Sequence, residues 1–286
     1  MGPHPRRAAV LGHPVAHSLS PLLHRAAYRD LGLVGWSYEA IDVTSEDLPG
    51  FVEGLDATWA GLSLTMPLKQ TVLPLLDHVE PLAGLVGAVN TVVVQASARG
   101  ALFLTGANTD VHGIVAALRE AATLPQRPRA VVLGGGATAA STLAALGELG
   151  CPDATVHVRS LGRVGPLVRA AHRMGLEPRL RSFADDVRST LLEADVVVST
   201  LPAHAADELA ASLAGAQVRG VLLDVVYDPR PTALMTAWRS AGGTAVGGER
   251  MLLHQAGEQV RLMTGRPAPL AAMDAALGEV LAEGSG

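Results

Sequence analysis

The chain has 286 residues, of which 49% are hydrophobic, 17% charged and 3% aromatic, with a formal net charge of −5. This balance excludes a disordered chain, and the acidic charge with few aromatic side chains argues against a nucleic-acid partner. The single cysteine, Cys151, excludes an internal disulfide and favours a cytoplasmic protein. No segment has the roughly 18 consecutive apolar residues of a membrane helix, so we expect no membrane partner.

Alternating strand and helix patterns fill the first part of the chain. Apolar runs predict strands within residues 8–12, 36–43, 61–65 and 88–94, and a helical pattern covers residues 21–32. Ser20 can cap this helix, Pro21 suits its first position and Gly32 can end it. The alternation predicts an α/β protein with a mainly parallel sheet.

A second α/β series follows a break at LTGANTD, residues 104–110. A helix is expected over 111–122 and a polar loop over 124–129. Apolar runs then predict strands within 130–133, 154–158, 194–200, 220–226 and 244–248, and two helices follow over 249–265 and 270–284. Because the doubly wound series is complete before these helices, we expect them to return to the first domain. The predicted domains are 1–106, completed by 247–286, and 107–246.

The stretch AVVLGGGATAAS has the pattern of a dinucleotide-binding turn. Gly134 and Gly136 follow an apolar strand and precede a helix, so backbone N–H groups can approach a pyrophosphate at the helix N-terminus. Ala139 stands in the place of the third glycine. A turn used only for packing is the alternative, but strand, glycines, helix and second strand come in the order that nucleotide binding requires.

The end of the second strand indicates which nucleotide binds. An NAD site has an acidic residue there for the ribose hydroxyl, whereas VHVRSLGR has none and carries Arg159, Ser160 and Arg163. A guanidinium pairs with a phosphate through charge-assisted hydrogen bonds. The sequence therefore predicts NADP, with a solvated surface arginine as the alternative.

Polar residues gather at the expected strand ends of the first domain, where open α/β sheets hold their ligands. They are Ser18, Ser20, Thr65, Lys69, Asn90, Thr91 and 108–110. Two serine hydroxyls beside a helix N-terminus suit a carboxylate. Helix caps at Ser20 and Asp110 and an ordinary turn at Asn90 are the alternatives.

Lys69 is the only lysine among 22 basic residues. An ammonium group can give up its proton and a guanidinium cannot, so proton transfer would explain a lysine here. Chance placement is the alternative. His13, His17 and His24 do not form a metal site, because Pro14 interrupts the helix that would align the first two and no Cys or carboxylate completes the set.

Taken together, the motifs resemble those of the shikimate dehydrogenase family. The chain carries, in order, GHPVAHSLSP, SLTMPLK, GAVNT, GANTD, GGGAT, VRSLGR, DVVYDPRPT and MLLHQA, which span nearly its whole length. They are similar to the family signatures G-x-P-x-x-H-S-x-S-P, N-x-T-x-P-x-K, G-A-x-N-T and G-x-N-T-D. A Gly-rich turn, a basic strand end, a Tyr after DVV and a late M-L-x-x-Q-A complete the family set.

The resemblance implies reversible reduction of 3-dehydroshikimate to shikimate by NADPH, in the pathway to chorismate and the aromatic amino acids. It implies an N-terminal substrate domain and a Rossmann-like NADP domain, with Lys69 and Asp110 as the catalytic pair. Ser18 and Ser20 would bind the substrate carboxylate. The implied ring-lining residues are Thr65, Asn90, Tyr227 and Gln255. The implied NADP residues are Gly134, Gly135, Gly136, Ala137, Thr138, Arg159, Ser160, Arg163, Thr200 and Gly248.

The chain departs from the family pattern at several positions. Ser63 stands where the family usually has Asn, and STLPAHA lacks the usual glycine two residues after Pro202. The other replacements, two at the nucleotide clamp and two in the late helix, are Val158, Ser160, Val260 and Met263. These changes concern cofactor contacts and pocket shape, and the catalytic pair is retained.

Two other functions stay open. One is a quinate/shikimate dehydrogenase using NAD or NADP. The absence of an acidic residue near Arg159 argues against the use of NAD. The other is a non-catalytic sensor of NADP or a shikimate-like ligand, which the retention of Lys69 and Asp110 argues against. We expect a monomer or a homodimer.

Overall fold

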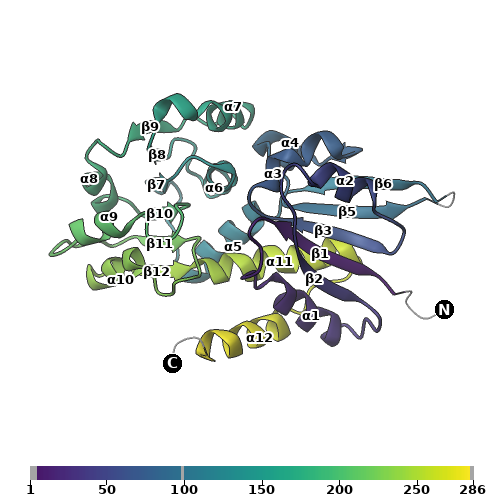
Figure 1. The fold of residues 1–286 in the computed structure, drawn as a ribbon. Helices are drawn as coiled ribbons and strands as arrows, with labels where there is room; N and C mark the ends of the chain where they lie inside the picture. The colour runs from purple at the N-terminus through teal and green to yellow at the C-terminus, as the bar shows by residue number, and fades with distance from the viewer. Residues whose placement is uncertain (1–4, 98–99, 284–286) are drawn as a thin grey trace. The chain divides into compact units, whose positions relative to one another are not determined.

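The computed structural model describes residues 5–97 and 100–283 (Figure 1). They form two compact units. Unit 1 takes in the described chain up to Gly84, Ala88–Thr109 and the chain from Leu253 onward, and unit 2 takes in Leu85–Gly87 and Asp110–Leu252. The division of the chain into a substrate domain and an NADP domain at the boundaries given above stays a prediction.

Unit 1 contains a mixed six-stranded sheet in the order β2-β1-β3-β5-β6-β4. The strands are β1 (Arg7–Gly12), β2 (Ser37–Asp42), β3 (Trp59–Leu64), β4 (His78–Val79), β5 (Thr91–Ala96) and β6 (Leu102–Ala107). β1 pairs in parallel with β2 and β3, and β4 in parallel with β6. β5 is antiparallel to both β3 and β6.

Helices cover both faces of this sheet. They are α1 (Ser20–Asp30), α2 (Leu48–Glu53), α3 (Leu68–Thr71), the part of α4 (Pro81–Val86) up to Gly84, the part of α11 (Gly248–Thr264) from Leu253 onward, and α12 (Leu270–Glu283). Leu62 and Leu64 of β3 pack with Leu48 of α2 and Leu68 of α3 in one apolar core. The predicted last helix extended to Gly284, which lies outside the described residues.

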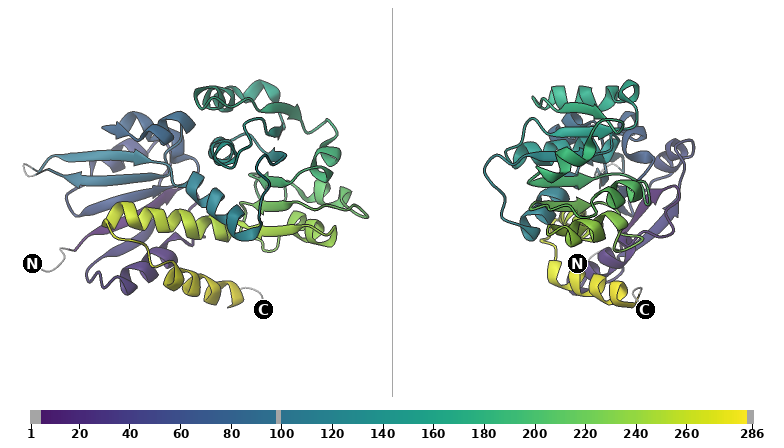
Figure 2. Two further views of the ribbon diagram at one scale, coloured as in Figure 1. Left: turned by 180° about the vertical axis from the view of Figure 1, so that it is seen from behind. Right: turned by 90° about the vertical axis from the view of Figure 1, so that its left-hand side faces the viewer.

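Alternate residues of β3 face the opposite side of the sheet, where α11 lies (Figure 2). A Cβ on Gly61 would lie 2.8 Å from Met263 Cγ of α11, so this glycine lets the helix approach closely. Ser63 is on the same face and stands directly opposite Thr91 of β5 in the antiparallel register. Polar side chains therefore line the seam between the sheet and α11.

Two expectations for unit 1 are wrong in detail. α1 begins at Ser20 itself, with Leu19 at the N-cap and no side-chain cap, so Ser20 is the first helical residue and not the cap. Its main-chain N–H donates to Ser18 Oγ. The break expected from Leu104 contains the end of β6, and the chain leaves the sheet only after Ala107. Gly32 does end α1, with φ of 62°.

Unit 2 contains a six-stranded sheet in the order β12-β11-β10-β7-β8-β9, with all neighbouring strands parallel. The strands are β7 (Ala130–Leu133), β8 (Thr155–Val158), β9 (Arg179–Ser182), β10 (Val196–Ser199), β11 (Val221–Asp224) and β12 (Thr244–Gly247). The chain runs outward through β8 and β9 and then returns to β10 beside β7. The strand order therefore reverses between β7 and β10, where doubly wound sheets bind ligands.

Helices also flank the sheet of unit 2 (Figure 1). They are α5 (Asp110–Ala121), α6 (Ala137–Glu148), α7 (Gly165–Arg173), α8 (Val187–Leu192), α9 (Asp207–Ser212) and α10 (Ala233–Ser240). One apolar core joins strand residues such as Leu133 and Leu222 to Leu191 of α8 and Trp238 of α10. Each unit thus has its own hydrophobic core.

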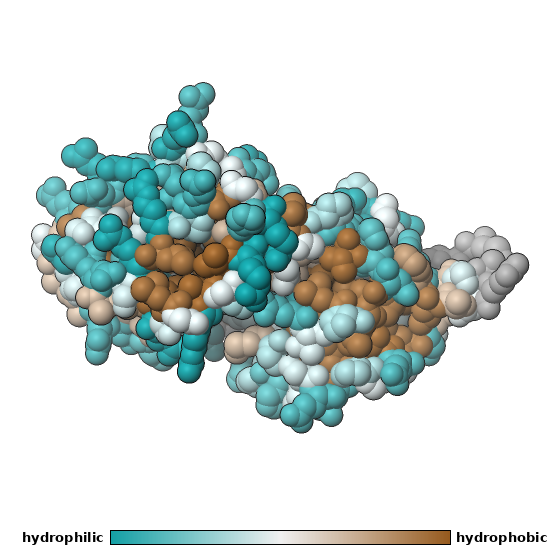
Figure 3. Space-filling view, turned by 90° about the horizontal axis from the view of Figure 1, so that it is seen from above, coloured by the Kyte–Doolittle hydropathy of each residue, from teal (hydrophilic) through white to brown (hydrophobic). Residues whose placement is uncertain are grey.

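The surface mixes apolar and polar residues. Figure 3 shows hydrophobic residues in patches on the visible face of each unit, bordered by hydrophilic ones. Val34 and Met66 are 81% and 71% exposed. Within the described part of the chain, every helix is too short or too polar to cross a membrane.

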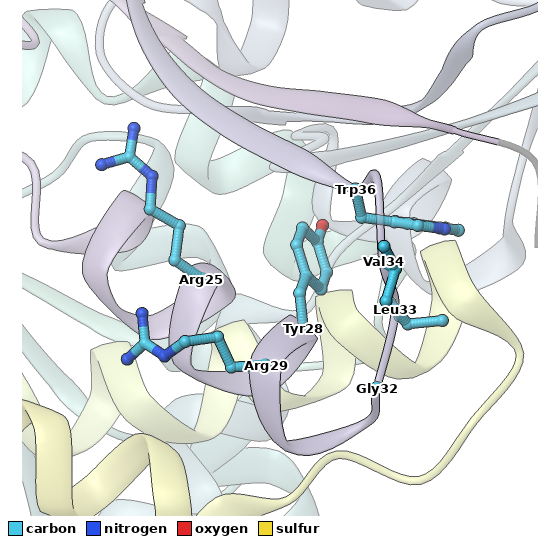
Figure 4. A pocket seen from close by; sticks show the side chains of 7 residues that line it. All are labelled: Arg25, Tyr28, Arg29, Gly32, Leu33, Val34 and Trp36. Carbon is cyan, nitrogen blue, oxygen red and sulfur yellow. The ribbon is translucent and has the colours of Figure 1, made fainter.

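A pocket of about 450 Å³ opens on unit 1 beside α1. In Figure 4, Tyr28 stands between Arg25 and Arg29 on one side and Trp36 on the other. The Arg25 Nε donates to the main-chain oxygen of Tyr38 at 2.9 Å, which fastens α1 to β2. The predicted site residues are not among those lining this pocket.

Candidate active site

Ser18 and Ser20 lie together at the start of α1. Ser18 Oγ accepts a hydrogen bond from Ser20 N at 3.3 Å, and Ser20 is only 4% exposed. The first N–H groups of a helix lack partners inside the helix and attract negative charge. The arrangement fits the predicted binding of a carboxylate.

Asn90 and Gln255 are hydrogen-bonded although 165 residues separate them. Asn90 Nδ2 donates to Gln255 Oε1 at 3.1 Å and to Thr109 Oγ1 at 2.9 Å. Asn90 Oδ1 accepts from the Thr109 main-chain N–H at 2.8 Å. All three residues are buried. The structure therefore brings together two of the predicted ring-lining residues, which come from the position just before β5 and from α11.

Lys69 lies in α3, directly after the turn that carries Thr65. Thr65 N donates to Leu11 O at 2.9 Å, which ties the turn to β1. The main-chain oxygen of Lys69 accepts from Val89 N at 2.8 Å, one residue before Asn90. Backbone hydrogen bonds thus hold the lysine segment next to the segment that carries Asn90.

Sequence reasoning missed Gln259, which lies one helical turn after Gln255 on α11. It is 1% exposed and hydrogen-bonds Ser63, Thr91 and His24. Residues four apart on a helix share a face. The pair of glutamines at this spacing is the signal in the sequence that could have identified Gln259.

The residues around Gln259 are polar but uncharged near neutral pH. The rings of His24 and Tyr38 stack with centroids 3.9 Å apart. Burial lowers the pKa of His24 to about 3, and the hydrogen bond with Gln259 acts in the opposite direction. Burial raises the pKa of the Tyr38 hydroxyl, against a smaller opposite effect of its hydrogen bond to Ser63.

In unit 2, Gly134 follows β7 and lies against Thr200, which follows β10. Thr200 N and Oγ1 both donate to Leu133 O, at 2.8 and 2.9 Å. Gly134 has φ of 112°, and a Cβ at this position would collide with Thr200 Oγ1. Only glycine meets both requirements, so the turn is built at the point where the strand order reverses.

The next residues leave the helix N-terminus accessible. Gly135 and Gly136 are exposed, and α6 begins at Ala137 with Thr138 in its first turn. A Cβ on Gly136 would meet no atom within 4 Å. The N–H groups at this end of α6 are therefore open to an anion, as a dinucleotide pyrophosphate requires.

Arg159, Ser160 and Arg163 follow β8 and are all exposed. Across residues 5–97 and 100–283, the structure pairs neither arginine with a carboxylate, and it holds the segment in a short turn in which Arg163 N donates to Ser160 O at 3.2 Å. Both guanidinium groups keep donors for a phosphate. The residues present thus fit an NADP cofactor.

Three further predicted residues belong to unit 2. Asp110 opens α5 and is 3% exposed. Tyr227 lies half-buried in the loop after β11, where burial raises the pKa of its hydroxyl. Gly248 opens α11, and a Cβ at this position would collide with Val225 O. The roles of these residues toward ligands stay predictions.

The histidines that were weighed as metal ligands have other partners. His13 Nδ1 lies 2.6 Å from Asp42 Oδ1, and His24 contacts Gln259. Among the residues that the structure describes, no group of three or more His, Cys, Asp or Glu side chains could hold a metal ion.

Two family models match parts of the chain, and relatives match nearly all of it. Residues 10–92 match the model of the shikimate dehydrogenase substrate binding domain, and residues 248–277 match that of the shikimate 5'-dehydrogenase C-terminal domain. A shikimate dehydrogenase (NADP(+)) of Methanothermobacter thermautotrophicus is 34% identical over 281 residues, 95% of each chain. The chain belongs to the shikimate dehydrogenase family.

Solved shikimate dehydrogenases share the fold. The enzyme of Mycobacterium tuberculosis matches with a TM-score of 0.85 and 43% identity, over 96% of this chain and 100% of that chain. The shikimate 5-dehydrogenase of Thermus thermophilus, solved in complex with NADP(H) and shikimate, matches with a TM-score of 0.76 and 32% identity, over 95% and 98%. The predicted α/β fold with a Rossmann-like unit is therefore confirmed.

Proposed function

We propose that this chain catalyses the reversible, NADPH-dependent reduction of 3-dehydroshikimate to shikimate. Family membership over nearly the whole chain supports the reaction. The observation that carries it to this chain's own residues is the hydrogen bond between Asn90 and Gln255. These two amides come from distant parts of the sequence and present donors and acceptors suited to a hydroxylated ring.

Lys69 and Asp110 carry the chemistry in this proposal. NADPH, when bound, supplies a hydride to the C3 carbonyl carbon. The carbonyl oxygen gains negative charge, which the protonated Lys69 amine stabilises before donating its proton to that oxygen. The Asp110 carboxylate orients the amine and an adjacent substrate hydroxyl. In shikimate oxidation, the amine of Lys69 takes the proton back.

Binding and orientation fall to the other residues of unit 1. The hydroxyls of Ser18 and Ser20 at the start of α1 hold the substrate carboxylate, where the helix end favours negative charge. Asn90 and Gln255, already hydrogen-bonded to each other, bind ring hydroxyls together with Thr65. Tyr227 of unit 2 contributes a hydroxyl to the same ring.

The cofactor preference follows from the basic turn after β8. Arg159 and Arg163 are exposed and have no acidic residue next to them in the sequence, so a ribose 2′-phosphate is favoured over a free hydroxyl. Gly134, Gly136 and the start of α6 receive the pyrophosphate, with Thr200 supporting the turn. Gly248 completes the cofactor side.

The proposal extends to the setting of the enzyme. The formal charge of −5 and the scarcity of aromatic residues support small-molecule ligands with no nucleic-acid partner. The single cysteine, Cys151, is buried and unpaired, which fits a reducing cytoplasm. We propose a monomer or a homodimer in that compartment.

The test is a spectrophotometric assay of nucleotide reduction. Purified protein is mixed with shikimate, quinate or no substrate, each with NADP and with NAD. We expect fast reduction with shikimate and NADP, and far less with the other combinations. Equal rates with quinate would support the broader quinate/shikimate dehydrogenase. Absence of any substrate-dependent reduction would contradict an enzymatic function and support a sensor.

A further inference from the structure

Gln259 uses the whole hydrogen-bonding capacity of its side-chain amide inside unit 1. Its Nε2 donates to Thr91 Oγ1 at 3.0 Å and to Asn90 O at 3.3 Å. Its Oε1 accepts from Ser63 Oγ at 2.8 Å and lies 3.2 Å from His24 Nε2. An amide has two donor hydrogens and two main acceptor directions, so every one of them is used.

The partners of Gln259 determine which way round its amide lies. The main-chain oxygen of Asn90 can only accept, so the amide nitrogen must face it. Oε1 therefore faces His24, whose Nε2 must carry a proton in order to donate. The other ring nitrogen of His24 is then free of a proton and accepts from the Tyr28 hydroxyl at 3.5 Å. The network has a single consistent arrangement of its protons.

On one side, this network reaches a predicted substrate-binding amide. Thr91 Oγ1 accepts from Gln259 and donates to Asn90 Oδ1 at 2.9 Å. Asn90 Nδ2 is left to donate to Gln255 and Thr109. Gln259 therefore helps to fix the side-chain rotamer of Asn90 through Thr91. It also binds the main-chain oxygen of Asn90 directly.

On the other side, the network reaches the predicted carboxylate site. The Tyr38 hydroxyl donates to Ser63 Oγ at 2.6 Å, and Ser63 donates on to Gln259. The Ser20 side chain lies close enough to the Tyr38 hydroxyl to lower its pKa slightly, against the larger effect of burial. The short side chain of Ser63 leaves room for the long side chain of Gln259. The amide of Gln259 thus lies between Asn90 and the predicted carboxylate site.

We propose that Gln259 is a positioning residue for substrate binding, which sets the side chain of Asn90 through Thr91 and that of Ser20 through Ser63 and Tyr38. This inference rests on the proposed function, because Asn90 and Ser20 are there assigned to shikimate. Gln259 acts through these residues and touches no reacting atom itself. Its loss leaves several buried donors and acceptors unpaired, and they must rearrange to find partners.

The first test is Gln259→Leu, which keeps the size of the side chain and removes the amide. We expect the KM for shikimate to rise about tenfold or more, while kcat changes less than about threefold, since the lost interactions orient binding groups in both ground and transition states. The Kd for NADP should stay the same, because the glycine turn belongs to unit 2. An unchanged KM overturns the proposal.

Thr91→Val provides a second test that removes only a hydroxyl. It should reproduce part of the rise in KM, and the double variant with Gln259→Leu should be no worse than Gln259→Leu alone, because the path through Thr91 is one of the two that Gln259→Leu already breaks. Fully additive effects would contradict the shared path. If Gln259→Leu does not fold, Thr91→Val decides by itself.

Leu277→Ala is the control for simple destabilisation. Leu277 is a buried apolar residue of α12 in unit 1, outside the network. Its truncation should lower Tm and leave the KM for shikimate unchanged; a matching rise in KM would show that loss of stability alone explains the effect. An inactive wild-type protein would contradict the proposed function itself, whereas an active one with a normal KM in Gln259→Leu contradicts only the positioning role.

Discussion

The carboxylate of Asp224 accepts a hydrogen bond from the hydroxyl of Thr232 at 2.8 Å, which joins the end of β11 to the start of α10. Thr232 also caps α10 by accepting from Met235 N at 3.2 Å. The loop between these two residues carries Tyr227, the proposed ring-lining hydroxyl of unit 2. A buried acid thus closes the loop that presents a substrate-binding residue.

Asp224→Asn should change how stability depends on pH. Burial raises the pKa of the Asp224 carboxyl, against the opposite effect of its hydrogen bonds with Thr232 and Val226. The folded protein therefore keeps this proton to a higher pH than the unfolded chain, and ionisation costs stability as pH rises above about 4. In urea unfolding from pH 4 to 7, the free energy of unfolding of the variant should increase relative to that of wild type as pH rises. Asp228→Asn, an exposed acid on the same loop, controls for the loss of one charge.

His24 should make the protein sensitive to acid. Burial lowers its pKa to about 3 in the folded protein. As pH falls below about 6.5, His24 therefore becomes protonated in the unfolded chain while it stays neutral in the folded protein. Stability is then complete above about 6.5 and falls as pH drops, by up to about 1.4 kcal/mol per pH unit. His24→Gln should flatten this slope in denaturant titrations between pH 7 and 4.5. An identical slope in the variant would mean that other groups account for acid sensitivity.

Lys69→Arg should be nearly inactive although it keeps the positive charge. A guanidinium does not release its proton, so kcat should fall on the order of 10²-fold or more. Lys69→Gln should be at least as slow, and matched Tm values would show that both variants fold. Turnover close to wild type in Lys69→Arg would disprove proton transfer by this side chain.

Arg159→Ala should reduce the preference for NADP over NAD. A hydrogen bond between charged groups contributes about 1.5–3 kcal/mol, which corresponds to roughly a ten- to hundredfold change in the ratio of kcat/KM for the two nucleotides. Arg169→Ala removes an exposed arginine of α7 and serves as the control. If both variants keep the wild-type ratio, Arg159 does not bind the 2′-phosphate.

Two alanine substitutions in the glycine turn should have different effects. Gly134→Ala places a Cβ against Thr200 Oγ1 at a positive φ, and should destabilise the fold by about 1–3 kcal/mol. Gly136→Ala adds its Cβ in open space with φ of −87°, so the fold should tolerate it while NADP binding weakens. Thermal unfolding and NADP titration separate the two effects. Equal loss of stability in both would contradict this reading of the turn.

Apolar runs predicted the central strands of both sheets, because strands buried on both faces are continuously hydrophobic. β9 escaped this reasoning since its sequence, RLRS, is polar and it lies at the edge of its sheet, half open to water. β4, also at an edge, is too short for any periodicity. β6 was not predicted as a strand, because most of it lies within LTGANTD, whose polar residues were interpreted as a break.

The candidate site was predicted from motifs, and the contacts among its residues were not. Nothing local in the sequence says that Asn90 meets Gln255, since 165 residues intervene. Gln259 lies outside the recognised motifs and acquires its partners only when α11 packs against the sheet. The cap assigned to Ser20 was wrong because the helix begins one residue earlier than the apolar pattern indicates, so Ser20 is its first residue and Leu19 takes the cap position.

The inclusion of the chain from Leu253 onward in unit 1 has a consequence for biosynthesis. Unit 1 receives α11 and α12 only after the whole of Asp110–Leu252 has been translated, whereas Asp110–Leu252 can fold before those helices are made. Until α11 has been translated, Ser63 of β3 and Thr91 of β5 lack their hydrogen-bond partner on that helix. Nascent chains arrested before Leu253 should therefore depend on chaperones, and truncation before Leu253 should abolish the enzyme.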